Sequence, residues 1–305
     1  MKISKRSDIL SKLKLSAIPD KYKGILCIIA SAFCFTVMNS FVRLAGDLPS
    51  VQKSFFRNAV AFVFALVILL KSHTSLLPAK KSNTGLLILR AACGTIGILC
   101  NFYAVDNLVL SDASMLNKMS PFFAVVFSFL FLREKTTIVQ TMGVIIAFLG
   151  SMLIIKPTFT NMELIPSVIG LVGGIAAGAA YTAVRSLGLK GEKGPYIVFF
   201  FSGFSCLITL PFLIFDFHAM TVEQWLILIA AGLAAAGGQF TITAAYRCAP
   251  AKEISVYDYS QIIFSAIFGF FLFSQIPDIW SVIGYVIICG MAVVMFIYNN
   301  KKSKS

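Results

Sequence analysis

The sequence predicts an all-α integral membrane protein of ten transmembrane helices, arranged as two five-helix repeats of inverted topology with both termini in the cytoplasm. Three observations support this class. Of the 305 residues, 58% are hydrophobic and only 13% are charged. Residues 102–155 align without a gap on residues 243–296, at an offset of 141. Finally, the basic residues gather in alternate connections, as they do in membrane proteins of fixed orientation.

Ten apolar segments are long enough to cross a hydrocarbon core about 30 Å thick, which takes about 20 residues. Backbone polar groups in lipid have to be satisfied within each segment, so we expect helices. The segments cover residues 24–45, 51–70, 85–104, 111–132, 137–156, 166–188, 195–215, 222–245, 252–273 and 279–298. We therefore expect a first repeat at 24–156 and a second at 166–298. Five spans in each repeat is an odd number, so the second repeat enters the membrane from the opposite side.

The two ends of the chain are basic and polar. Residues 1–23 contain no apolar run of 7–15 residues, so a cleaved signal peptide is not expected. We interpret them as a cytoplasmic tail, with a segment lying on the membrane surface as the alternative. Residues 299–305 form a second basic tail.

The net charge of +13 reflects where the loops lie. With the N-terminus in the cytoplasm, nineteen Lys and Arg residues fall in cytoplasmic segments, and only Lys53 and Lys156 fall outside. We therefore expect a lipid bilayer as partner and no nucleic acid. The seven cysteines and two histidines show no spacing typical of metal ligands, so neither a metal nor a cofactor is expected.

Loop charge also tests the repeat. The connection at 106–112 carries Asp106 and Asp112 and is expected outside. The matching connection at 247–253 carries Arg247 and Lys252 and is expected inside. Matching loops thus change sign, as inverted topology requires.

Polar residues share one face of the third and fourth spans. Arg90, Gly94, Gly97 and Asn101 are spaced 4, 3 and 4 residues apart, which puts them on one side of a helix. In the fourth span, Asn117 and Lys118 precede Pro121, which is expected to kink the helix. Ionisable side chains in a membrane usually face the bundle interior or a water-filled cavity.

The eighth and ninth spans, which match the third and fourth in the repeat, carry Gln239 and the run Tyr257, Asp258, Tyr259. We expect Arg90, Asn101, Asn117, Lys118, Gln239, Tyr257 and Tyr259 to bind a substrate, and Asp258 to take a proton or act as counter-charge. The alternative is a buried ion pair that only fixes the bundle.

Two further sets of residues are interpreted as structural. Gly170, Gly174 and Gly178 repeat at four-residue spacing in the sixth span, which lets helix backbones approach closely. With Gly94, Gly97 and Pro121 we assign them to helix packing or gating. Arg43 and Arg57 flank the first outer loop and are interpreted as interfacial anchors, with a binding role as the alternative.

Residues 101–135 carry a pattern that resembles a known signature. Asn101-Phe102-Tyr103-Ala104, Asp112-Ala113, Ser120-Pro121 and Glu134-Lys135 resemble the EamA branch of the drug/metabolite transporter superfamily. The resemblance implies a secondary transporter in the cytoplasmic membrane, built as a five-plus-five bundle around a central cavity. It does not specify the cargo, because one fold hosts many substrates.

We therefore expect a transporter, not an enzyme, that moves a small anionic or zwitterionic metabolite by alternating access. Protons or a counter-substrate are the expected coupling partners, and the protein is expected to be a monomer or a homodimer. The alternative function is a passive channel or a lipid scramblase. An enzyme would need a nucleophile with a base, a metal set or a phosphate-binding loop, and the sequence shows none of these.

Overall fold

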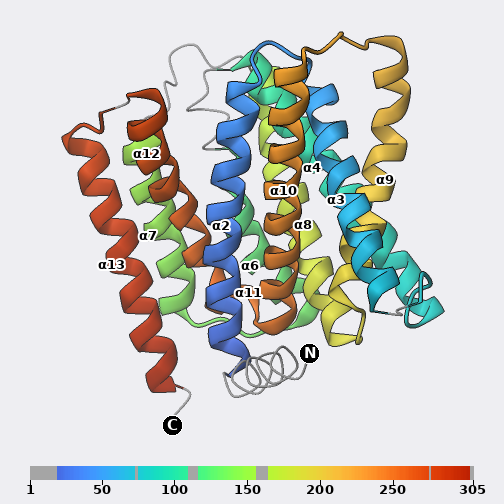
Figure 1. The fold of residues 1–305 in the computed structure, drawn as a ribbon. Coiled ribbons are helices and arrows are strands. Elements are labelled where there is room, and N and C mark those ends of the chain that lie inside the picture. Colours follow the sequence, from blue (N-terminus) through green and yellow to red (C-terminus); the bar gives the residue numbers. More distant parts are fainter. Residues whose placement is uncertain (1–18, 73–74, 109–115, 156–163, 275, 303–305) are drawn as a thin grey trace, which may run out of the picture.

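The computed structural model describes residues 19–72, 75–108, 116–155, 164–274 and 276–302. Within these ranges the chain forms α-helices and two short 3-10 helices and contains no strand (Figure 1). The elements are α2 (Asp20–Leu44), α3 (Ser50–Lys71), η1 (Lys81–Asn83), α4 (Thr84–Asn107), α6 (Ser120–Leu132), α7 (Ile138–Ile155), α8 (Leu164–Leu189), α9 (Gly194–Phe215), α10 (Val222–Cys248), α11 (Ala251–Ile254), η3 (Ser255–Tyr259), α12 (Ser260–Phe273) and α13 (Ile279–Lys302).

Nine helical segments of the described chain are long and apolar enough to cross a membrane, with α11, η3 and α12 together forming one of them. The expected all-helical membrane fold is therefore confirmed. The fourth expected span differs, because its described helix, α6, has only 13 residues. Residues 109–115, the start of that expected span, lie outside the described residues.

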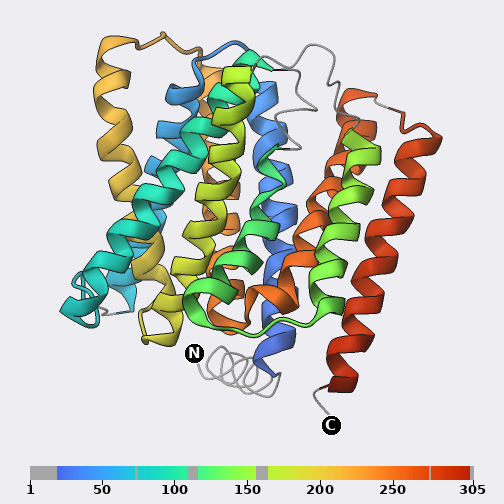
Figure 2. The same ribbon diagram turned by 180° about the vertical axis from the view of Figure 1, so that it is seen from behind.

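The helices pair in a way that repeats between the two halves of the chain. The contact of α2 with α10 has its counterpart in the contact of α8 with α4, and α3 and α7 pack against their own equivalents, α9 and α13. Seen from both sides, α2 and α8 run in opposite directions through the bundle (Figures 1 and 2). This arrangement is the one that an inverted repeat generates.

Backbone geometry gives a second sign of the repeat. Arg133 follows α6 and Ser274 follows α12, and both adopt a left-handed conformation, with φ of 55° and 52°. Apart from glycines, they are the described residues with positive φ. Such conformations are uncommon for residues with a side chain. Their sequence numbers differ by 141, the offset of the sequence repeat.

Two expected spans are interrupted at equivalent positions. The chain makes a turn at Lys118 and Met119 before α6 begins, and the 3-10 helix η3 interrupts the ninth span at Ser255–Tyr259. The expectation that Pro121 kinks the interior of a helix is therefore wrong. It lies in the first turn of α6, where its missing N–H leaves no helical hydrogen bond unmade. The ninth expected span consists of α11, η3 and α12, which together still form one candidate membrane span.

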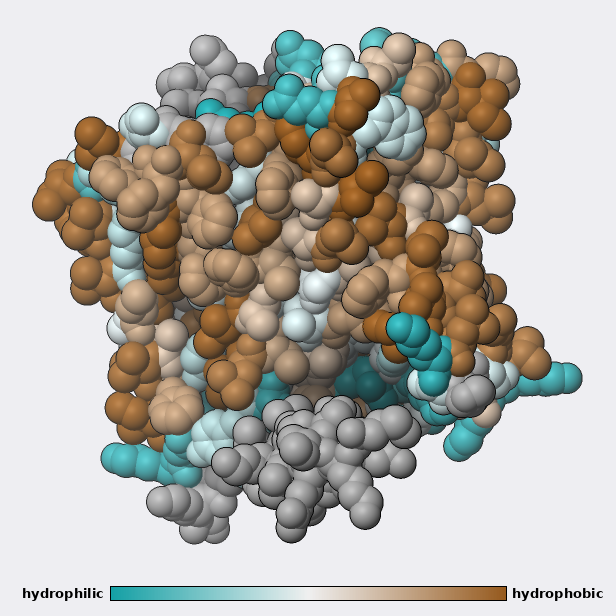
Figure 3. Space-filling view, viewed as in Figure 1, coloured by the Kyte–Doolittle hydropathy of each residue, from teal (hydrophilic) through white to brown (hydrophobic). Residues whose placement is uncertain are grey.

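The face of the bundle seen in Figure 3 is mainly apolar, and its polar residues gather toward the two ends. Phe131 and Phe215 are 73% and 89% exposed, as suits side chains that meet lipid. The start of α2 and the end of α13 lie together, since Lys21 and Tyr22 both donate hydrogen bonds to Oδ1 of Asn300. Both ends of the described chain thus lie on one side of the bundle, here called the terminal side.

Candidate substrate-binding cavity

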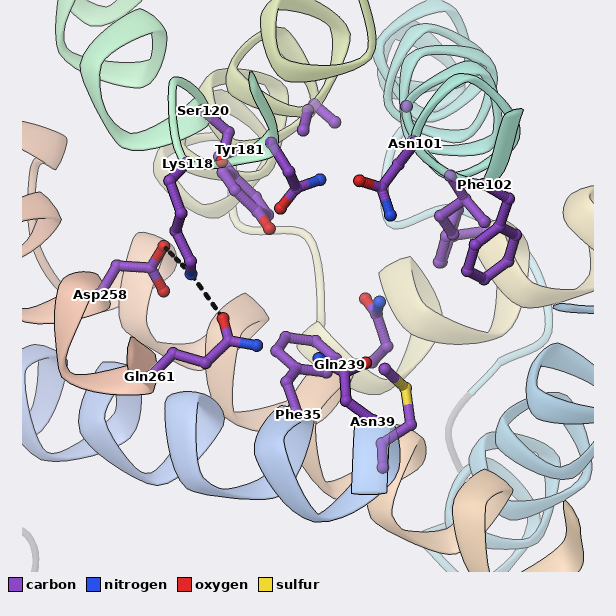
Figure 4. Close-up of a pocket in the computed structure, with 18 of the residues that line it drawn as sticks. Phe35, Asn39, Asn101, Phe102, Lys118, Ser120, Tyr181, Gln239, Asp258 and Gln261 are labelled. Carbon is purple, nitrogen blue, oxygen red and sulfur yellow. Dashed lines mark hydrogen bonds and ion pairs between the residues drawn. The ribbon is translucent and has the colours of Figure 1, made fainter. Parts of the chain in front are cut away.

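A cavity of about 150 Å³ lies in the middle of the bundle, between the two repeats. Residues of α2, α3, α4, α6, α8, α9, α10, η3 and α12 line it. In Figure 4, Lys118, Asp258 and Gln261 lie across the cavity from Asn101 and Phe102. Its principal polar lining residues are Asn39, Arg57, Arg90, Asn101, Asn117, Lys118, Ser120, Tyr181, Gln239, Asp258 and Gln261.

Four pairs of residues that match each other in the repeat line the cavity. The matched pairs are Asn39 with Tyr181, Gly97 with Gln239, Asn117 with Asp258, and Ser120 with Gln261, at offsets of 141 or 142. Both repeats therefore contribute to the cavity wall at equivalent positions. The wall is nevertheless chemically asymmetric, because no matched pair is identical.

The two helix interruptions place Lys118 and Asp258 side by side. Lys118 donates a hydrogen bond of 2.6 Å to Oε1 of Gln261, and its Nζ lies 3.8 Å from Oδ2 of Asp258. Lys118 is 8% exposed and Asp258 is 5% exposed. Tyr259 also donates a hydrogen bond to the backbone carbonyl of Lys118, which ties the two interruptions together.

Arg90 enters the cavity from α4. It is 3% exposed and donates a hydrogen bond of 3.2 Å to Oε1 of Gln239. Its guanidinium carbon lies 4.0 Å from the centre of the Phe201 ring, in cation–π contact. The face expected from the 4, 3 and 4 spacing is thus aimed at the cavity, because Gly94, Gly97 and Asn101 line it with Arg90.

The structure corrects the interpretation of Arg57. It is not an interfacial anchor at the rim but a cavity residue, 8% exposed, with its guanidinium carbon 5.9 Å from the centre of the Phe35 ring. The sequence contained a sign of this burial, because Arg57 is the seventh residue of the expected span 51–70. At about 1.5 Å per residue, that places its Cα about 10 Å into the helix. Asn39, Tyr181 and Gln261 are further lining residues that we did not expect to bind substrate.

The remaining expected site residues lie away from the cavity wall. Tyr257 and Tyr259 are buried in η3 and are not among the lining residues. On α8, Gly174 and Gly178 face the segment that carries Lys118 and the start of α6. A Cβ added at Gly178 would lie 2.6 Å from Cβ of Phe123. The structure places Gly170 in the same row, against Leu116.

The cavity continues into a vestibule of about 870 Å³. The two spaces share Asn39, Asn101, Lys118 and Gln261 among their lining residues. The vestibule extends to the end of α2, the start of α3 and the connection between α12 and α13. It therefore opens at the side opposite to the terminal side. Its outer lining residues include Arg43, Ser50, Lys53, Ile276 and Pro277.

A set of side-chain contacts lies between the cavity and the terminal side. Along α8, which runs toward the terminal side, Tyr181 forms the cavity wall and stacks on Tyr246 at 4.8 Å. One turn further on, Nε of Arg185 lies 2.9 Å from Oε1 of Glu134, and Nη1 of Arg185 donates to the backbone carbonyl of Arg247. We call this set the terminal-side closure.

A bundle of membrane-spanning helices with interrupted helices around a polar cavity at a repeat interface is the architecture of a multi-pass membrane transporter. Comparison with known proteins agrees with this class. The chain belongs to the EamA-like transporter family, whose model matches residues 22–156 and again residues 165–297. Membership points to a transporter rather than an enzyme.

Several relatives are named as transporters. The pseudopaline exporter CntI of Pseudomonas aeruginosa is 31% identical over 267 residues, which is 87% of this chain and 93% of that protein. The riboflavin transporter of Brucella anthropi is 26% identical, covering 91% of this chain and 99% of that protein. A crystal structure that is 12% identical superimposes with a TM-score of 0.80 over 91% of this chain and 98% of its own, which shows a shared fold.

Proposed function

We propose that this chain is a secondary active transporter that moves a small anionic or zwitterionic metabolite across the cytoplasmic membrane by alternating access. The observation that carries the proposal is the charge of the cavity. Three buried cations, Arg57, Arg90 and Lys118, face one buried carboxylate, Asp258. Burying a charge is expensive unless it is paired, so an excess of cations favours an anionic group as occupant.

The roles of the lining residues follow from their chemistry. Arg90 and Lys118 attract a carboxylate or phosphate, and the amides of Asn101, Asn117 and Gln239 orient it by hydrogen bonds. Asp258 either takes a proton or pairs with the amino group of a zwitterion. The cargoes named for the relatives differ, so the cavity and not the family supports this choice of substrate.

Access to the cavity from one side of the bundle supports the alternating-access mechanism. The vestibule leads to the cavity from the side opposite to the termini, while the Tyr181–Tyr246 stack and the Glu134–Arg185 ion pair lie between the cavity and the terminal side. With cytoplasmic termini, as the loop charges predict, this is an outward-facing state. In the opposite state the terminal-side closure opens and the vestibule closes, which an inverted repeat achieves by exchanging the conformations of its halves.

The alternative function is a passive channel or a scramblase, which needs a continuous polar path through the membrane. The two functions differ in whether internal substrate is exchanged for external substrate. A transporter loaded with internal substrate accumulates labelled external substrate transiently, whereas a channel does not.

The test is counterflow in proteoliposomes, using a substrate first identified by thermal shift against a panel of metabolites, since binding to the native state raises its melting temperature. Saturable counterflow by the wild type is expected, with large losses for Lys118→Ala and Asp258→Asn. Lys190→Ala, which removes an exposed cation at the end of α8, is the control and should retain counterflow. If both cavity variants exchange substrate like the wild type, the proposed site is wrong.

A further inference from the structure

The cations of the cavity fall into two groups with different surroundings. Lys118 has a carboxylate beside it, so its charge is largely balanced within the protein. Arg57 and Arg90 have none, because no described carboxylate lies within ion-pair distance of either guanidinium. The Nε atoms of both arginines are buried and unpartnered within the described structure. Two like charges lining one small cavity also repel each other.

Aromatic rings hold both arginines without neutralising them. Arg57 lies over Phe35, and Arg90 lies over Phe201. A ring face stabilises a guanidinium through its quadrupole, yet it leaves the edge of the planar group, which carries the N–H donors, free for a ligand. Only one hydrogen bond to a described residue, from Arg90 to Gln239, uses any of these donors.

Gly94 gives Arg90 the room that this position requires. It lies one turn after Arg90 on α4, and a Cβ placed there would collide with Nη1 of Arg90 and lie 2.8 Å from Cε2 of Phe201. Because Gly94 has no side chain, the guanidinium of Arg90 lies close to the surface of its own helix on its way to the cavity. This makes Gly94 a positioning residue for the charge and not only a packing residue.

We propose that Arg57 and Arg90 form a dianion subsite, so that the substrate carries two negative charges, as a small dicarboxylate or a phosphate monoester does. This inference rests on the proposed function and specifies its substrate class. Planar guanidiniums bind carboxylate and phosphate oxygens in pairs. The cavity, at about 150 Å³, is below the range of about 300–1,000 Å³ that holds drug-sized ligands, so the charged part of the substrate is small.

The first experiment measures binding by melting temperature in nanodiscs at fixed ionic strength. The probes are succinate, inorganic phosphate, acetate, and succinamide, the neutral diamide with the shape of succinate. Succinate or phosphate is expected to stabilise the wild type in a saturable way, acetate less, and succinamide not at all. If neither dianion stabilises the wild type more than succinamide does, the dianion subsite is refuted.

The second experiment assigns the effect to residues. Arg57→Gln and Arg90→Gln should each weaken dianion binding by about tenfold to a hundredfold, the range for a lost hydrogen bond to a charged group. Gly94→Ala should weaken it by displacing Arg90. Gly85→Ala is the matched control on the same helix, because a Cβ there meets nothing within 4 Å. Dianion affinities unchanged in both glutamine variants would overturn the proposal.

Counterflow separates this inference from the proposed function. If a zwitterionic metabolite exchanges through Arg57→Gln and Arg90→Gln proteins at the wild-type rate, the proposed transport stands and the dianion subsite is refuted. If the wild type binds dianions through both arginines but exchanges no solute, the subsite stands and the transport proposal is refuted.

Discussion

The terminal-side closure offers a direct test of alternating access, through the substitution Glu134→Gln. The carboxylate of Glu134 pairs with Arg185 at 2.9 Å, and the side chains are 15% and 13% exposed. Glutamine keeps the size of the side chain and its hydrogen-bonding capacity but removes its charge. The substitution therefore weakens the closed form of this side without creating a cavity.

The size of the effect follows from the burial of the pair. A hydrogen bond to a charged group contributes about 1.5–3 kcal/mol, whereas a solvent-exposed ion pair contributes about 0–1 kcal/mol. The pair is mostly buried, but Arg185 retains its bond to the carbonyl of Arg247, so we expect about 1.5–2.5 kcal/mol. Since about 1.4 kcal/mol changes an equilibrium constant tenfold, the ratio of outward-facing to inward-facing protein should fall about tenfold to sixtyfold.

The assay is alkylation of a single cysteine introduced at Ser265, which lines the vestibule, in a background without the seven native cysteines. In the Glu134→Gln protein the alkylation rate is expected to fall as the vestibule closes in more molecules. Asp20→Asn, which removes the exposed Asp20–Lys23 pair on α2, is the matched control and should leave the rate unchanged. Equal alkylation rates in wild-type and Glu134→Gln proteins would refute the assignment of this pair to a gate.

Three other predictions concern residues in or near the cavity. Tyr246→Ala removes the stack on Tyr181 and should favour the inward-facing state. Tyr246→Phe keeps the stack and should leave the equilibrium unchanged. Substrate leak from loaded proteoliposomes measures the difference between the two variants. Gly178→Ala brings a Cβ against Phe123 and should lower stability by about 1–3 kcal/mol in thermal unfolding, while Gly290→Ala, with nothing within 4 Å, should not. Asp258→Asn removes the carboxylate beside Lys118 and should tighten binding of an anion measured by thermal shift; weaker binding would contradict a purely electrostatic role.

Much of the fold follows from the sequence because lipid imposes simple rules. Length and apolar composition define the spans, and the structure has nine of them within the described residues. The helical face of Arg90, Gly94, Gly97 and Asn101 reaches the cavity because the period of a helix fixes which residues share a side. Lys118 and Asp258 come together because the repeat sets the pair Asn117–Lys118 over the pair Asp258–Tyr259.

Other features depend on backbone details that periodicity does not contain. The chain turns before Ser120 because a proline next to it favours the start of a helix over its interior, and hydropathy alone does not separate the two. Tyr257 and Tyr259 fall beside the polar Asp258 in sequence, but the 3-10 turn directs only Asp258 to the cavity. Arg57 was interpreted together with Arg43 as a residue that flanks the first outer loop, yet it is buried. Its distance from the end of the helix was the better guide to its burial.

The two repeats contribute opposite charges to the cavity. Arg57, Arg90 and Lys118 all belong to the first repeat, whereas Asp258 belongs to the second. A ligand shifts a conformational equilibrium only through different affinities for the two states. A substrate with anionic groups on the arginines and a polar group at Asp258 contacts both repeats at once, so its binding energy changes whenever they move relative to each other. Under the alternating access proposed above, this unequal charge between two similar halves would allow a bound metabolite to influence which side of the membrane the cavity faces.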